Sequence, residues 1–93
     1  METTTAQVAT TNAEKYIGQL CKHWSHKFET KWDSSTGQVD LPGGPVHFRA
    51  NGSTLTITIE AKDEETSSRM KDVIQRHLDR FAFREVPLNY VWS

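Results

Sequence analysis

The stretch HWSHK at residues 23–27 brings two imidazole groups and one ammonium group close together in the chain. On a helix, His23 and His26 would be neighbours, because side chains three residues apart share a face. Protonated imidazole and ammonium groups bind anions, whereas a neutral imidazole is a common metal ligand. A metal site needs three or four ligands, and His77 could join this pair. With no HExxH or CxxC pattern in the chain, a metal site would depend on these three histidines.

An anion site has more support, because basic residues gather toward the ends of two expected helices. The candidate ligand-binding residues are Lys22, His23, His26, Lys27, His77, Arg80 and Arg84. If the two helix ends meet, these residues form a basic patch edged by Trp24, Phe81 and Phe83, suited to a carboxylate, a phosphate or a conjugated anion. Cations near helix C termini also oppose the helix dipole, so both clusters have a structural explanation as well.

Each histidine also has an ordinary structural interpretation. His26 falls on the solvent side of its helix, where a single polar residue needs no explanation. His23 borders the apolar stripe, so it suits a groove and solvent equally well. His77 lies on the buried stripe of its helix, where a histidine commonly forms a hydrogen bond with a carbonyl or carboxylate group.

The sequence does not favour an enzyme. Cys21 lies at the edge of an apolar stripe, where a cysteine is more often a small buried hydrophobe than a nucleophile. No glycine-rich phosphate loop follows a strand pattern, and no serine has the context of a nucleophile elbow. No cofactor is predicted.

Two helices and a sheet are expected to position these residues. Apolar side chains at helical spacing, from Tyr16 to Phe28 and from Met70 to Phe81, predict the helices. Alternation of apolar and polar residues predicts strands at residues 28–33, 38–41, 46–50, 54–60 and 88–92. Because an apolar sheet face must be covered, the order αββββαβ predicts a two-layer α+β domain. Its helices should pack on one face of a mostly antiparallel sheet.

Local signals mark the ends of several of these elements. Asn51-Gly52 predicts a hairpin turn of type I′, in which both central residues have positive φ. Asp63 is placed to cap the second helix. Thr11, or else Asn12, is placed to cap the first helix. Pro87 should interrupt the chain before the last strand.

Length and composition indicate a single soluble domain. We expect residues 1–11 to be a flexible tail and residues 12–93 to form one domain. The net charge is −1, from 11 Lys and Arg against 12 Asp and Glu, which disfavours nucleic acid as a partner. No apolar run suits a membrane span or a secretory signal, so we expect a cytoplasmic protein without membrane contact. The oligomeric state is not indicated.

Four runs of the sequence carry a family resemblance: CKHWSHKFE, QVDLPGG, LTITIEA and RHLDRFAFRE. Over residues 14–92 the chain resembles a family of small bacterial proteins known as domain of unknown function 2218. The matching motif positions are Cys21, His23, His26, Lys27, His77, Arg80, Phe81, Phe83, Arg84 and Glu85. Some members are joined to, or encoded near, flavin-dependent siderophore-interacting reductases. The resemblance therefore implies a place near iron acquisition, with a ferric siderophore or such a reductase as partner, and implies no catalytic role.

Three hypotheses for function follow from these observations. The first is a binding module that uses the basic patch for a small anionic or ferric ligand or for a reductase surface. The second is a metal-binding protein that uses His23, His26 and His77. The third is a structural or oligomeric partner that docks through a sheet edge or its final strand.

Overall fold

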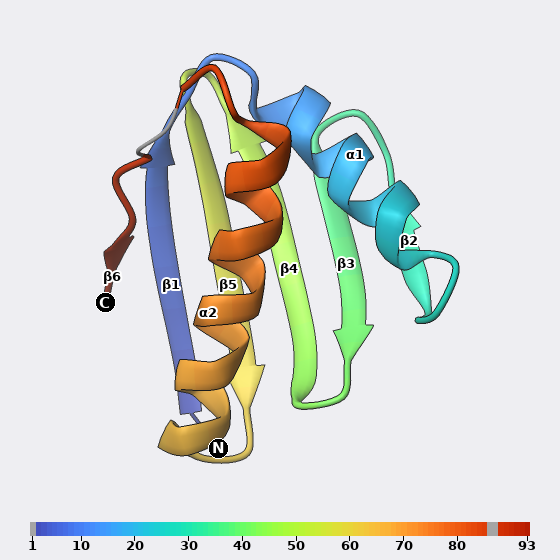
Figure 1. Cartoon of the computed structure of the whole chain (residues 1–93), viewed down its shortest axis with the longest axis vertical. Helices are drawn as coiled ribbons and strands as arrows, with labels where there is room; N and C mark the ends of the chain where they lie inside the picture. Colours follow the sequence, from blue (N-terminus) through green and yellow to red (C-terminus); the bar gives the residue numbers. More distant parts are fainter. Residues whose placement is uncertain (1, 86–87) are drawn as a thin grey trace.

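Two helices cover one face of a six-stranded antiparallel sheet, which confirms the predicted two-layer α+β architecture (Figure 1). The structure is a computed structural model that describes residues 2–85 and 88–93. Its elements are β1 (Glu2–Ala9), α1 (Ala13–Trp24), β2 (Thr30–Trp32), β3 (Thr36–Leu41), β4 (Gly44–Asn51), β5 (Thr54–Ala61), α2 (Glu64–Phe81) and β6 (Val91–Trp92). The strand order in the sheet is β2-β3-β4-β5-β1-β6.

The prediction of a flexible tail at residues 1–11 is wrong. Strand β1 pairs with β5 along its whole length, from Glu2 opposite Ala61 to Ala9 opposite Thr54. It contributes only Ala6 and Val8 to the core, because the other residues on its inward side are Glu2 and Thr4. So few inward apolar residues leave a weak alternation signal, although β-branched threonine suits a strand. The ordered domain therefore begins before α1, and Met1 lies outside the described residues.

The predicted meander is confirmed, since β2, β3, β4 and β5 are neighbours in sequence order. The turn of the β4–β5 hairpin differs from the predicted one in its position and type. Asn51 pairs with Thr54, so Gly52 and Ser53 form the loop. Only Gly52 has positive φ there, at 62°, as expected for a type II′ turn rather than the predicted type I′. The β3–β4 loop is equally short, because Leu41 pairs with Gly44.

Both helices pack their apolar stripes on the sheet. Helix α1 buries Tyr16, Ile17, Leu20, Cys21 and Trp24. It ends at Trp24 and not at Phe28, because a turn follows in which the Phe28 amide donates to the Trp24 carbonyl. Helix α2 begins as predicted, with the Asp63 carboxylate accepting a 2.8 Å hydrogen bond from the Thr66 amide.

The first helix lies very close to β3. A Cβ atom on Gly37 would lie 2.7 Å from Cys21 Sγ and 2.9 Å from Ile17 Cγ2. Because Gly37 has no side chain, α1 can pack this close to the sheet, and a larger residue at this position would push the helix away. This close approach sets the position of the C-terminal end of α1, where HWSHK begins.

The chain end returns to the sheet as a shorter strand than predicted. In β6, Val91 and Trp92 pair with Gln7 and Ala6 of β1. The preceding Tyr90 hydroxyl donates a 2.9 Å hydrogen bond to Asp79 of α2. These contacts tie the last residues to both layers, while Pro87 lies outside the described residues.

Candidate functional site between the two helices

The C-terminal end of α1 meets the second half of α2, as the anion-site hypothesis requires. The ring centroids of His23 and His77 are 5.3 Å apart. Trp24 lies 5.1 Å from His77, and Phe81 lies 6.0 Å from His23. Residues far apart in sequence thus form one aromatic cluster in which two imidazoles are accessible.

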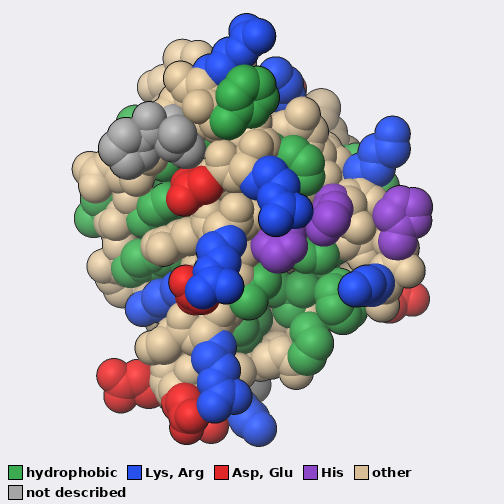
Figure 2. Space-filling view, in the orientation of Figure 1, with side chains coloured by type: hydrophobic (Ala, Val, Ile, Leu, Met, Phe, Trp, Pro, Cys, Tyr) green, Lys and Arg blue, Asp and Glu red, His purple; other side chains and the backbone are tan. Residues whose placement is uncertain are grey.

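A groove of about 720 Å³ opens beside this cluster. It is lined by His23, Trp24, His26, Lys27, Phe28, Leu41, Pro42, Gly43, Lys62, Thr66, Arg69, Met70, Val73 and His77. These residues come from the end of α1, the β3–β4 loop, the β5–α2 connection and α2. Figure 2 shows histidine side chains next to an apolar area, with lysine and arginine side chains around it.

The groove has an apolar floor and a basic rim. Buried or half-buried Trp24, Leu41 and Met70 supply the apolar part. Lys27, Lys62 and Arg69 line it with positive charge, and the lining that the structure describes contains no aspartate or glutamate. The lining residues therefore carry a net positive charge, although Arg69 is already paired with Glu65 outside the groove.

His77 has the structural role that its position on the buried stripe suggested. Its Nδ1 donates a 2.7 Å hydrogen bond to the Val73 carbonyl one turn earlier in α2. This bond fixes the neutral ring as the tautomer with hydrogen on Nδ1, which leaves Nε2 as an acceptor. The residue is thus both held by the helix and able to present one nitrogen to a ligand.

His23 lies in a basic environment. Partial burial lowers its pKa below the usual value of 6.5, and the charges of His77, Arg80, His26 and Lys27 lower it further. The ring is therefore mostly neutral at neutral pH while the groove is empty.

The structure gathers most, but not all, of the predicted ligand-binding residues. His23, His26, Lys27 and His77 line the groove, and Arg80 is near enough to act on His23. Lys22 and Arg84 do not line it. The guanidinium of Arg84 instead lies 5.7 Å from the ring of Phe83, which is 68% exposed.

The three-histidine metal site is not assembled. Across residues 2–85 and 88–93, no three His, Cys, Asp or Glu side chains are close enough together to hold a metal ion. His23 and His77 meet across the helices. His26, beyond the last turn of α1, does not complete a ligand set with them.

Sequence reasoning missed the half of the groove that lies around the start of α2. Lys62, Arg69, Val73 and the Pro42-Gly43 loop all line it. A Cβ on Gly43 would lie 2.6 Å from Thr66 Cγ2 and 2.7 Å from Met70 Sδ, so the loop packs directly against the helix. The Pro-Gly-Gly-Pro run signals a tight turn but not the element that the turn contacts.

The expectation for Cys21 is confirmed. The thiol is fully buried beneath α1, and burial raises its pKa to about 11. A thiol with so little thiolate at neutral pH is a packing group.

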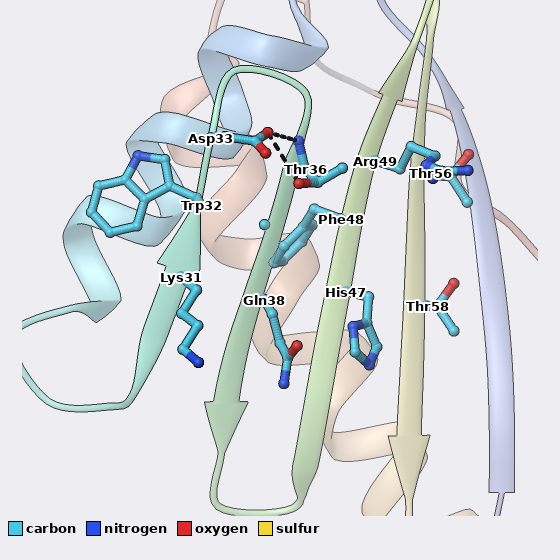
Figure 3. A pocket seen from close by; sticks show the side chains of 11 residues that line it. Lys31, Trp32, Asp33, Thr36, Gln38, His47, Phe48, Arg49, Thr56 and Thr58 are labelled. Atoms are coloured by element: carbon cyan, nitrogen blue, oxygen red, sulfur yellow. Dashed lines mark hydrogen bonds between the residues drawn. The ribbon is translucent and has the colours of Figure 1, made fainter.

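A second hollow, of about 620 Å³, lies on the opposite face of the sheet (Figure 3). Its main row runs across four strands, with Lys31 opposite Gln38, Gln38 opposite His47, and His47 opposite Thr58. The His47 imidazole is 2.8 Å from Glu60 Oε2, so this ring already has a carboxylate partner. This hollow is mainly a row of polar side chains, and its apolar part comes from Trp32 and Phe48.

The matching family covers residues 5–93 and is described as "Uncharacterized protein conserved in bacteria (DUF2218)". The chain belongs to this family. A solved structure from Pseudomonas aeruginosa, titled "NMR structure of PA4090", is similar to the chain with a TM-score of 0.84 and 30% sequence identity. The match covers 100% of this chain and 96% of that one. No curated protein is significantly similar to the chain. No helix among the described residues is long and apolar enough to cross a membrane.

The two runs at residues 21–29 and 76–85, which carry the resemblance in the sequence, lie in different surroundings. Residues 21–29 supply the α1 side of the groove. The run at residues 76–85 supplies His77 and ends at Glu85, whose carboxylate accepts hydrogen bonds from Thr10, Asn12 and Tyr16. Glu85 therefore joins the end of α2 to the start of α1.

Proposed function

We propose that this DUF2218 protein is a small binding module whose groove takes an anionic ligand with an apolar or aromatic body. The observation that carries the proposal is the combination of an apolar floor with rim cations and no lining carboxylate. A groove of about 720 Å³ is in the size range of small-molecule sites. Apolar burial would supply most of the affinity, and the rim would select negative charge.

A ferric catecholate siderophore belongs to this ligand class, because the complex combines aromatic rings with a net negative charge. The family resemblance supports testing it first. The reductase partner that the resemblance implies stays a prediction of the sequence. The described groove lining includes imidazoles but no thiol or carboxylate that could act as a nucleophile, and we therefore propose binding and no reaction.

The proposal is tested with two matched fluorescent probes. Anilinonaphthalene sulfonate has an aromatic body and a permanent negative charge, and phenylnaphthylamine has nearly the same body without the charge. We expect saturable binding of the sulfonate at one site, with a Kd at least about tenfold lower than that of the neutral probe. A ferric dihydroxybenzoate complex should displace it, as measured by isothermal titration calorimetry.

A pair of double variants locates the site. Lys27→Glu with Lys62→Glu reverses two exposed rim charges and should weaken sulfonate binding by about tenfold or more. Lys31→Glu with Arg49→Glu makes the same charge change on the opposite sheet face, at exposed positions, and should leave the Kd within about twofold. Equal affinity for both probes, or equal effects of the two double variants, would refute the groove as an anion site.

A further inference from the structure

The groove has two places where a ligand's acid group could lie. One is the His23–His77 pair, where the rings are 5.3 Å apart and are flanked by Trp24 and Phe81. The other is the Lys62 and Arg69 side of the rim. The following inference rests on the proposed function and decides between these two ends.

The Lys62–Arg69 end is the poorer site for a ligand's charge. Arg69 already donates a 2.7 Å bond to Glu65, and both side chains are largely exposed to water. Ion pairs at such positions contribute little, because water and salt screen them. An acid group placed there would also compete with the Glu65 carboxylate.

The histidine end is built around groups that favour an anion. His77 and Arg80 of α2, together with His26 and Lys27 after α1, surround His23, and none of these groups is acidic. His77 donates its Nδ1 hydrogen to the Val73 carbonyl, so its Nε2 remains available. The aromatic rings of Trp24 and Phe81 flank the pair, with Trp24 5.1 Å from His77 and Phe81 6.0 Å from His23 between ring centroids.

We propose that the acid group of the ligand lies between His23 and His77, and that binding brings one proton from solvent onto this imidazole pair. The protonated pair then donates N–H bonds to the anion, which a neutral pair can do only in part. The favoured ligand class is an aromatic acid that stays ionised in mildly acidic solution, such as a sulfonate, a phosphate ester or a ferric catecholate.

The sign of the pH dependence follows from linkage. In the empty groove, burial and neighbouring cations hold the pKa of His23 below 6.5. A bound anion raises the pKa of the pair, so the complex binds more protons than the free protein does. Affinity therefore rises as pH falls from the raised pKa of the complex toward the pKa of the free protein, and is constant below it. Each unit by which the pKa rises strengthens binding about tenfold.

Anilinonaphthalene sulfonate tests this inference, because its own charge does not change in this range. The Kd is measured by fluorescence from about pH 8 to about pH 5.5, and proton uptake by calorimetry in buffers of different ionisation enthalpy. For the native protein we expect about tenfold tighter binding at the acidic end and uptake approaching one proton. His23 is exposed, and His23→Gln should remove most of the pH dependence of the Kd. His77→Gln should do the same.

One histidine outside the groove serves as the matched control. His47→Gln lies on the other sheet face and should keep the full pH dependence. If the sulfonate binds in the groove with a Kd that does not change with pH, or if His23→Gln and His77→Gln behave as the native protein does, the inference is overturned. The proposed function would still hold in that case, since it depends on the Lys27 and Lys62 variants.

Discussion

The two hollows of this protein lie on opposite faces of one sheet and differ in how they are made. The groove opens at an incompletely covered part of the core, where the β3–β4 loop and α2 leave Val73 38% exposed beside buried Leu41 and Met70. The outer hollow consists of side chains that stand side by side on a pleated sheet (Figure 3). Both contain a histidine and two or more cations, so residue types alone do not distinguish them.

This difference determines at which surface a ligand would bind with the more favourable free energy. In the groove a ligand would cover apolar surface, at roughly 25 cal/mol for each Å² removed from water. In the outer hollow a ligand would cover part of the Trp32 ring but would otherwise replace water around polar groups, and such exchanges yield little net free energy. The groove also shares residues with the core, so its shape depends on the packing of both helices. The outer hollow depends only on strand register.

The largest expected effect compares the two tryptophans at these sites. Trp24 is 4% exposed and packs against Phe48 and His77, whereas Trp32 at the rim of the outer hollow is 43% exposed. Trp24→Ala should lower the free energy of unfolding by about 3–5 kcal/mol, because it leaves a cavity in the core. Trp32→Ala should lower it by less than about 1 kcal/mol. Urea denaturation followed by circular dichroism measures both, and similar losses would mean that the two surfaces are equally integral to the fold.

The next effect concerns Gly37, which lines the outer hollow but faces α1 from its other side. In Gly37→Ala the new Cβ would clash with Cys21 and Ile17, so α1 must shift and the free energy of unfolding should fall by about 1–3 kcal/mol. Gly18→Ala is the matched control, since a Cβ there meets nothing within 4 Å. It lies inside α1 and should stabilise the protein by about 0.5–1 kcal/mol. Effects of the same sign would contradict the close packing of α1 on β3.

A smaller effect is expected at Glu85, which holds the two helices together away from the groove. Glu85→Gln keeps the shape but weakens the bonds from Thr10, Asn12 and Tyr16, at a cost of about 1 kcal/mol. Hydrogen exchange should quicken at the start of α1 and the end of α2. It should stay unchanged in β3 and β4, which form the outer hollow. Equally faster hydrogen exchange in the helices and in β3 and β4 would show that Glu85 does not specifically hold the two helices together.

The Glu85 bonds also predict how stability depends on pH. Hydrogen bonds from Tyr16 and Asn12 lower the pKa of Glu85 below its usual 4.5. The stabilisation is therefore complete above pH 4.5 and is lost as pH falls through the lower pKa of the folded state. The difference in unfolding free energy between native protein and Glu85→Gln should shrink in the same acidic range. A constant difference across that range would mean that the carboxylate charge contributes nothing.

Much of this architecture could be predicted from the sequence, because each helix and the strands β2 to β5 carry their own periodic signal. Strand β1 could not, since only Ala6 and Val8 are apolar residues on its inner side. Strand β1 forms by pairing with the edge of β5, and this tertiary contact leaves no local pattern in the sequence. The last strand was predicted at residues 88–92, but β6 contains only Val91 and Trp92.

The candidate site was also predicted only in part. Helical spacing placed His23 and His77 on faces that could meet, and both line the groove. His26 and Lys27 also line it, although they lie in the turn beyond the end of α1 at Trp24. Arg84 lies beyond the end of α2 at Phe81 and does not line the groove, so helical spacing decides the place of none of these three residues. Lys62 and the Pro42-Gly43 loop were missed, because their relation to α2 depends on strand register and not on local pattern.

The smallest expected effect concerns His47, the histidine of the outer hollow. Its 2.8 Å contact with Glu60 is about 40% exposed on both sides, and exposed pairs of this kind contribute little. His47→Gln should change the free energy of unfolding at neutral pH by at most about 0.5 kcal/mol. It should also leave the Kd for anilinonaphthalene sulfonate unchanged, whereas His23→Gln should raise it in mildly acidic solution. Urea denaturation and the fluorescence titration check the two parts. A clear loss of affinity in His47→Gln alone would reverse the assignment, because the outer hollow would then be the anion site.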